Sequence, residues 1–212
     1  MDIIINSPIE NAPKSSVAIP SQNDFMLNVL VQLGQDPICT PIASLLSQYY
    51  KLPGEWLIAS PIHWQATHND AIIVAFGDAL NLSETTAQAW FTAVSQFLEA
   101  DNFQLFYHNP TYWLIQAENR PRLHSNNLNA IQYQSMIPAL MKLGEAVYWQ
   151  RILTELQMFL FTHPLNHSRA GQDAIKPTHP INGIWFWGGG KINPDLISTR
   201  PIISNSIIIN NF

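Results

Sequence analysis

Residues Pro180 to Lys191 have the sequence Pro-Ile-Asn-Gly-Ile-Trp-Phe-Trp-Gly-Gly-Gly-Lys. Large aromatic side chains favour a packed, pleated surface, so Ile184 to Trp187 is predicted to form a buried strand. The glycines that follow permit positive φ angles and a close approach of another group. A strand that ends at a glycine run can present backbone N–H groups to an anion. The alternative is a tight turn after a core strand, and the pattern favours it.

Two segments have the apolar spacing of long amphipathic helices. Ser83 is a good N-cap, and the helix after it is expected to extend to about Ala100. The second helix is expected from Glu145 to Phe161, because His163-Pro164 should end it. Shorter helices are expected at 24–33, at 37–50 and near Ile137, and further strands at 55–64, 71–76, 103–107, 112–117 and 202–209.

The order of these segments predicts the fold class. Strand pairs that alternate with single long helices are typical of an α+β domain. We expect a mostly antiparallel sheet that is covered on one side, with two long amphipathic helices and a short helical N-terminal region. Residues 1–22 are rich in Pro, Ser and Asn and are predicted to form a flexible arm, and residues 23–212 a single domain.

The chain carries few charges and is acidic. Charged residues make up 12% of the sequence, and the formal net charge is −5. Nucleic-acid binding relies on clustered Lys and Arg, and because the sequence has no such cluster we expect no nucleic-acid partner. The single cysteine, Cys39, lies among apolar residues and is predicted to be a buried thiol. The sequence has neither the pattern of a signal peptide nor a membrane-spanning stretch, which favours a cytoplasmic protein without a membrane partner.

Several blocks of the sequence resemble one protein family. The blocks are Pro61-Ile-His63-Trp64-Gln65-Ala66-Thr67-His68-Asn69-Asp70, Leu82-Ser83-Glu84, Asn109-Pro110-Thr-Tyr-Trp113 and the segment from Glu155 to Gly190. Over residues 55–192 the chain resembles the bacterial RpfE-type regulatory proteins, which are often described as phosphoglycerate-mutase-like. It is more distantly similar to archaeal-type cofactor-independent phosphoglycerate mutases, through His163-Pro-x-Asn166-x-x-Arg169 and Asn182-x-Ile-Trp185-x-Trp-Gly188.

The resemblance implies a mutase-related domain without mutase activity. Enzymes of that superfamily bind two metal ions through Asp-Gly, Asp-x-x-x-His and Gly-His-Asp elements, and none of these patterns occurs in this sequence. A two-metal site needs several carboxylates and imidazoles that converge within a few ångströms. We therefore expect no metal and no cofactor, and we assign no residue a catalytic role.

The histidines are expected to be structural or exposed, and Glu155 in the second long helix is expected to be structural. His163 and His167 have a spacing that suits a metal ion on a helix, but Pro164 disfavours a continuous helix there. His63 and His68 are predicted to be structural or exposed in the same way. Glu155 interrupts an apolar helix face, so it needs a donor such as Arg169 or Arg151.

The best candidate for a ligand site combines two cations, two amides and the glycine run. Arg and Lys would supply charge, Asn would supply directed hydrogen bonds, and the glycines would offer an approach surface for a phosphate or carboxylate. The set is Asn166, Arg169, Asn182, Gly188, Gly189, Gly190 and Lys191. In another interpretation Asn166 and Asn182 are structural clamps whose amides replace missing backbone hydrogen bonds.

Three functions are compatible with these features. The favoured one is a non-catalytic regulatory or binding protein, whose partner would be a small anionic ligand or a protein. The second is a phosphoryl-transfer or phosphate-ester enzyme, phosphomutase- or phosphatase-like, with an anion site at the Gly188–Lys191 loop. The third is an interaction module that binds a partner through exposed aromatic side chains such as Trp56 or Trp113.

Overall fold

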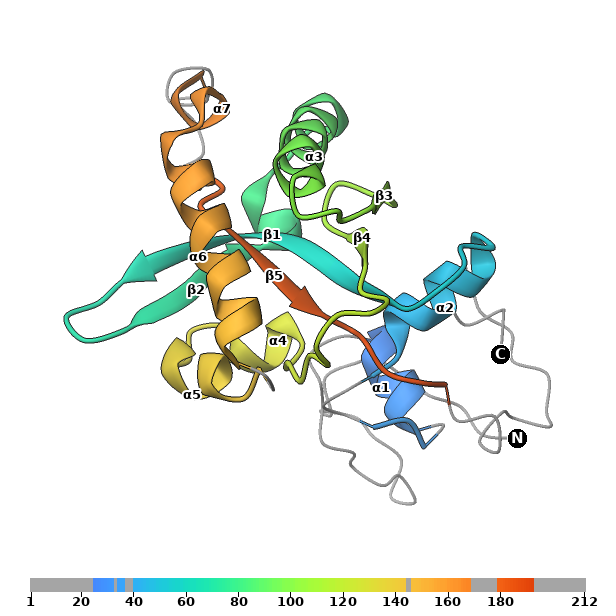
Figure 1. Cartoon of the computed structure of the whole chain (residues 1–212). Helices are drawn as coiled ribbons and strands as arrows, with labels where there is room; N and C mark the ends of the chain where they lie inside the picture. The colour runs from blue at the N-terminus through green and yellow to red at the C-terminus, as the bar shows by residue number, and fades with distance from the viewer. Residues whose placement is uncertain (1–24, 33, 37–39, 144–145, 169–178, 193–212) are drawn as a thin grey trace, which may run out of the picture.

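The computed structural model describes residues 25–32, 34–36, 40–143, 146–168 and 179–192. The predicted arm at 1–22 and strand at 202–209, as well as Cys39 and Arg169, lie outside these ranges. Within them the chain forms an α+β fold with a mostly antiparallel five-stranded sheet, which confirms the predicted fold class (Figure 1). The two long helices and the short N-terminal helices are also as predicted.

The elements follow one another as two short helices, two strand pairs that a long helix separates, four further helices and a final strand (Figure 1). The strands are β1 (Trp56–Ala66), β2 (Ala71–Phe76), β3 (Leu105–Tyr107), β4 (Trp113–Gln116) and β5 (Gly183–Trp187). The helices are α1 (Phe25–Gln32), α2 (Ile42–Tyr49), α3 (Glu84–Glu99), α4 (Leu128–Ile131), α5 (Met136–Met141), α6 (Ala146–Thr162) and α7 (Pro164–Ser168), and a 3-10 turn at Gly77–Leu80 joins β2 to α3.

The long strand β1 is the centre of the sheet. Ala59 pairs with residues of both β4 and β5, and Ile62 pairs with residues of both β2 and β5. Therefore β5 lies along one edge of β1, while β4 and β2 follow each other along the opposite edge. Pro61 lies between the stretches that pair with β4 and β2, where its missing N–H deprives neither strand of a donor. β3 pairs with β4 and ends the sheet on that side.

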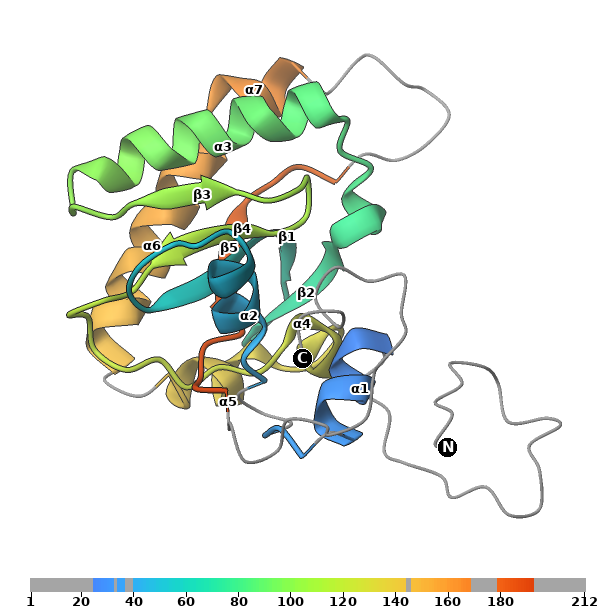
Figure 2. The ribbon, with the colours of Figure 1, turned by 90° about the vertical axis from the view of Figure 1, so that its right-hand side faces the viewer.

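Helices cover both faces of the sheet, and the prediction of one covered face is wrong. On one face α6 packs on β5, and α3 packs on the β3–β4 hairpin, where the rings of Phe91 and Tyr107 lie 5.3 Å apart. On the other face α2 packs on β1, and Tyr50 at the end of α2 lies 4.7 Å from Phe106. Because helices pack on both sides, residues 56–62 of β1 are all buried. In Figure 2 α3 lies above the strands, along β3, and α2 lies in front of them.

The two long helices form for the reasons that their sequences predict. Ser83 caps α3, because its Oγ accepts a hydrogen bond from the Thr86 N–H at 3.2 Å. α6 buries its apolar face against the sheet and ends at Thr162, and α7 then begins at Pro164, in the first-turn position that proline favours. The short helices α4 and α7 were not predicted. None of the helices in the described ranges is long and apolar enough to span a membrane.

Candidate functional site

The two asparagines of the predicted ligand set are structural clamps. The Asn166 amide donates to the carbonyls of Leu160 and Ile181 at 2.8 and 2.7 Å, and its oxygen accepts from the Ile181 N–H at 3.0 Å. Asn182 accepts from the Trp64 N–H at 2.8 Å and donates to the Trp64 carbonyl at 2.9 Å. Both side chains therefore take the place of peptide groups, which confirms the clamp interpretation.

The glycine run after β5 holds the N-terminus of α2. Gly188 has a φ angle of +70°, and its carbonyl accepts a hydrogen bond from the Ala43 N–H at 3.0 Å. The Gly190 carbonyl accepts a hydrogen bond of 2.6 Å from the Ser44 hydroxyl. Pro41 precedes the helix and offers no side-chain cap, so the Gly188 carbonyl satisfies one of the N–H groups that a helix N-terminus leaves open.

The structure does not bring the predicted ligand set together. Asn166 and Asn182 bind the chain at the start of β5, whereas the glycine run follows its end. The five residues of β5 between them span about 17 Å of extended chain. Lys191 is exposed beyond the glycines, and Arg169 lies outside the described residues. Anion binding at Gly188–Lys191 stays a prediction.

His63 and His179 lie side by side, whereas His163 packs on a tryptophan. His63 on β1 hydrogen-bonds through Nδ1 to the Pro180 carbonyl at 2.8 Å, and its ring lies 5.0 Å from that of His179. His163 packs on Trp90 of α3 at 4.9 Å. In the part of the chain that the structure describes, no three or more His, Cys, Asp or Glu side chains are grouped to hold a metal ion.

His63, together with His108 directly after β3, makes the stability of the fold depend on pH. Burial lowers the pKa of both His63 and His108, so each imidazole takes up a proton at lower pH in the folded than in the unfolded chain. Just below the ordinary histidine pKa of about 6.5 the unfolded state therefore binds more protons, and stability falls as pH falls. We expect a lower urea midpoint at pH 5.5 than at pH 7.5. His63→Gln with His108→Gln should reduce this difference, and an undiminished difference in that variant would contradict the assignment.

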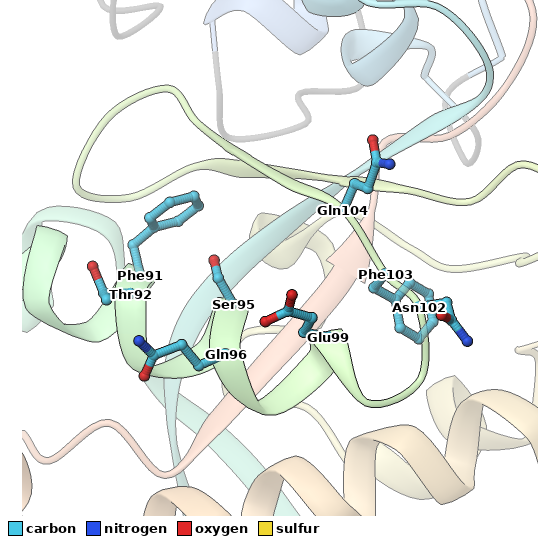
Figure 3. A pocket seen from close by; sticks show the side chains of 8 residues that line it. All are labelled: Phe91, Thr92, Ser95, Gln96, Glu99, Asn102, Phe103 and Gln104. Atoms are coloured by element: carbon cyan, nitrogen blue, oxygen red, sulfur yellow. The ribbon is translucent and has the colours of Figure 1, made fainter.

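A surface hollow of about 470 Å³ lies between α3 and the turn that leads into β3 (Figure 3). Phe91, Ser95 and Glu99 of α3 line one side, and Phe103 and Gln104 line the other. The Ser95 hydroxyl oxygen is buried and has no hydrogen-bond partner in the described part of the chain. A buried polar group without a partner costs about 1–3 kcal/mol. The hollow thus combines apolar rings, a carboxylate and an unused hydroxyl.

The strand beside this hollow has a free edge. β3 pairs with β4 and with no other strand of the described sheet. Gln116 N–H donates to the Gln104 carbonyl at 2.8 Å, so this pair is a hydrogen-bonded one. Hydrogen-bonded and non-bonded pairs alternate in an antiparallel ladder, so Phe106 is also bonded to β4. It follows that the N–H and C=O groups of Leu105 and Tyr107 point away from β4.

The far end of this edge lies close to the first turn of α3. The ring of Tyr107 packs edge-on against Phe91 on α3. Burial raises the pKa of the Tyr107 hydroxyl to about 12, with a further contribution from the nearby Glu84 carboxylate. Glu84 also accepts a hydrogen bond from the Gln88 side chain at 2.9 Å. A carboxylate therefore lies near each end of the edge, Glu84 beside Tyr107 and Glu99 in the hollow.

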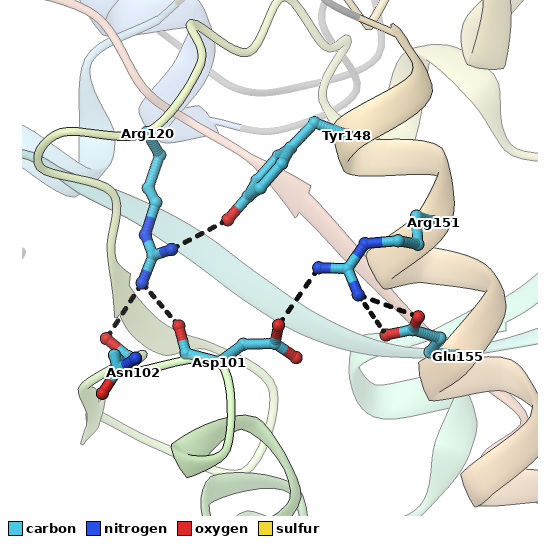
Figure 4. A network of polar contacts seen from close by, with 6 residues as sticks. All are labelled: Asp101, Asn102, Arg120, Tyr148, Arg151 and Glu155. Atoms are coloured by element: carbon cyan, nitrogen blue, oxygen red, sulfur yellow. Dashed lines mark hydrogen bonds and ion pairs between the residues drawn. The ribbon is translucent and has the colours of Figure 1, made fainter.

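Two arginines bind the turn between α3 and β3, and Asn102 and Phe103 of this turn line the hollow (Figure 4). Arg120 donates to the carbonyls of Asp101 and Asn102 at 2.7 and 3.0 Å, and its guanidinium lies 4.3 Å from the centre of the Phe103 ring. Arg151 on α6 pairs with the Asp101 carboxylate at 3.1 Å. Carbonyl and carboxylate contacts together fix the path of the chain from α3 to β3, so the hollow is built on a rigid support.

The structure bears on two further sequence predictions, one for Glu155 and one for Trp56 and Trp113. Glu155 pairs with Arg151 at 2.9 Å, and Arg151 is one of the two donors predicted for it. Trp56 and Trp113 are only 6% and 0% exposed, so the prediction that they form an exposed interaction surface is wrong. Their rings complete the core instead, because the sheet is covered on both faces. Large apolar side chains are exposed elsewhere, at Tyr133, Met141, Val147, Met158 and Phe161.

Neither the hollow nor the free edge of β3 was predicted from the sequence. The signal for the hollow in the sequence is the polar side of α3, where Ser95 and Glu99 follow Phe91 at helical spacing. The sequence predicts a strand at 103–107, and only the structure shows that it is shortened to Leu105–Tyr107 at the sheet margin. Comparisons with protein-family models, with curated proteins and with solved structures found no match to this chain.

Proposed function

We propose that this protein is a non-catalytic binding protein that receives an extended segment of a partner protein as an additional strand beside β3. The observation that carries the proposal is the free edge of β3, where Leu105 and Tyr107 direct their backbone groups away from β4 and next to the hollow. Proteins that bind peptides by strand addition combine such an edge with pockets for alternate side chains.

An added strand would use both the edge and the hollow. Leu105 and Tyr107 together offer two N–H and two C=O groups, which allow up to four backbone hydrogen bonds. Side chains alternate between the two faces of a strand, so every second side chain of the partner would face α3. There it would meet the partly exposed side chains of Phe91 and Ser95.

The choice of β3 over the other outer strands, β2 and β5, follows from what already covers them. On β2 the Ile73 carbonyl accepts a hydrogen bond from the Tyr133 N–H at 3.0 Å, and Gln132 forms a bridge to Ile73. All five residues of β5 are buried, and α6 packs on this strand. The three residues of β3 are all partly exposed. A partner chain could therefore reach the backbone of β3 without the removal of a helix.

The expected affinity from the backbone alone is modest. A hydrogen bond contributes about 0.5–1.5 kcal/mol net, so four contribute on the order of 4 kcal/mol. This corresponds to a Kd of about 1 mM. Side-chain contacts in the hollow must supply the rest, and they would decide which partner binds. Reversible binding of this strength fits a regulatory protein.

The resemblance to RpfE-type regulatory proteins and to a mutase-related domain is compatible with this proposal and stays a prediction. The alternative is a phosphoryl-transfer or phosphate-ester enzyme with its anion site at Gly188–Lys191. A screen of phosphorylated metabolites, with Lys191→Ala as the control protein, distinguishes the two functions. Turnover that requires Lys191 would favour the enzyme.

Replacement of Leu105 with proline should weaken peptide binding about tenfold or more, because one donor is lost and one acceptor on the peptide stays unpaired. The proline removes an N–H that points away from β4, so the pairing between Phe106 and β4 is kept. The probe is a fluorescein-labelled ten-residue peptide of alternating Val and Thr, and fluorescence anisotropy gives its Kd.

Leu105→Ala is the matched control, because it shortens the side chain and keeps the N–H. It should bind the peptide more tightly than Leu105→Pro does. Thermal melts of both variants check that the fold is intact. Equal affinity of the parent and of a folded Leu105→Pro protein would overturn strand addition at β3.

A further inference from the structure

We infer that the chain segment bound beside β3 is basic and carries two Lys or Arg residues about six positions apart. This inference rests on the proposed function, since it defines the partner of the same site. It follows from the charges that α3 places along the edge of β3 and from the distance between them.

One side of α3 forms a stripe along the edge of β3. Glu84, Gln88, Phe91, Ser95 and Glu99 follow one another at spacings of three or four residues, so they share one side of the helix. The middle of the stripe contacts the hairpin and lines the hollow. Its first and last members are glutamates, so the stripe ends in a carboxylate on each side and is longer than the three-residue edge of β3.

Nothing basic neutralises these two carboxylates in the described ranges. Neither Glu84 nor Glu99 forms an ion pair with a described residue, and no Lys or Arg lines the hollow. The nearby arginines are already engaged: Arg120 binds the carbonyls of Asp101 and Asn102, and Arg151 pairs with Asp101 and Glu155. The net charge of −5 gives the whole chain an attraction for cations as well.

The length of the stripe sets the spacing of the partner's cations. Fifteen residues separate Glu84 from Glu99, which is about 22 Å along a helix at 1.5 Å per residue. An extended chain rises about 3.3 Å per residue, so six to seven residues cover this distance. Only side chains an even number of positions apart lie on one face of a strand. A spacing of six positions therefore directs both basic side chains of the partner toward α3.

The size of the effect is limited by solvent. Both glutamates are exposed, and an exposed ion pair contributes about 0.2–1 kcal/mol. Two such pairs should tighten binding by about twofold to thirtyfold at low ionic strength. Salt screens exposed charges, so the gain should disappear near 1 M NaCl, where the screening length is about 3 Å.

The experiment compares three labelled peptides that share the alternating Val and Thr sequence. One is unchanged, one has two lysines six positions apart, and one has two glutamates at the same positions. We expect the lysine peptide to bind about twofold to thirtyfold more tightly than the unchanged one, and the glutamate peptide to bind more weakly. In the Glu84→Gln, Glu99→Gln double variant, the three Kd values should converge.

The matched control is the Glu55→Gln, Glu118→Gln double variant, which changes the net charge equally at two exposed carboxylates outside the stripe. It should keep the preference for lysine. Equal binding of all three peptides to the parent, with loss of binding in Leu105→Pro, would overturn the charge inference and leave strand addition intact. Undiminished binding of the lysine peptide to folded Leu105→Pro would instead overturn strand addition.

Discussion

Replacement of Asn182 with alanine should lower the free energy of unfolding by about 2–4 kcal/mol, because two backbone groups of Trp64 lose their partners and each costs about 1–3 kcal/mol. β5 pairs with β1 as far as Ile62, and the Asn182 side chain then continues the ladder to Trp64. A register shift between His63 and Trp64 lies at this point on the β2 side. Asn182 thus secures β1 where its pairing is irregular. Urea unfolding measures the change.

Two comparisons make this prediction specific. His179→Ala, three residues away in sequence, should lower the midpoint much less, because its described contact is a ring contact with His63. Asn182→Asp keeps the acceptor for the Trp64 N–H but places an oxygen against the Trp64 carbonyl, so it should also be destabilised. If Asn182→Ala unfolds at the same midpoint as His179→Ala, the clamp at β1 does not contribute as described.

Replacement of Gly183 with alanine should destabilise the fold by about 3 kcal/mol, at the upper end of the usual cost of overpacking. A Cβ atom at Gly183 would overlap the indole ring of Trp64, which is itself 8% exposed and has little room to move. Gly183 is therefore required for space between β5 and the Trp64 ring, not for a positive φ angle. Thermal and urea unfolding measure the loss.

A smaller side chain at position 64 tests this cause. In a Trp64→Leu background the added methyl group of Gly183→Ala has space, so its additional cost should fall below about 1 kcal/mol, a non-additivity expected for residues in contact. Gly77→Ala is a useful control, since a Cβ there meets nothing within 4 Å although the φ angle is +56°. An equal cost of Gly183→Ala in both backgrounds would contradict the overlap with Trp64.

The fold was predictable from the sequence where local signals are strong. Ser83 and the apolar spacing of α3 determine that helix with little help from the rest of the chain, and the Trp-Phe-Trp run identifies β5. The second helical layer was missed because it depends on the alternation of Phe106 and Tyr107 between faces. Both residues are aromatic, so a three-residue strand with helices packed on both faces has no polar side to reveal its orientation.

The candidate site was predictable only in part. The clamp role of Asn166 and Asn182 could be predicted, because a long irregular segment before a core strand needs side-chain hydrogen bonds. The separation of these amides from the glycine run could not be predicted. The two groups are close in sequence, but the extended strand β5 places them at its opposite ends. The edge of β3 is a property of strand order. The local sequence at Leu105–Tyr107 does not indicate that one edge of this strand lacks a neighbour in the described sheet.

Amide hydrogen exchange at β3 tests the central claim most directly. The exchange rates of the Leu105, Phe106 and Tyr107 amides are measured by NMR with and without the alternating Val and Thr peptide. Phe106 is bonded to β4 in both states and serves as the internal control. We predict that the amides of Leu105 and Tyr107 become protected when the peptide binds, while Phe106 changes little. Binding of the peptide with unchanged exchange at Leu105 and Tyr107 would contradict strand addition at β3.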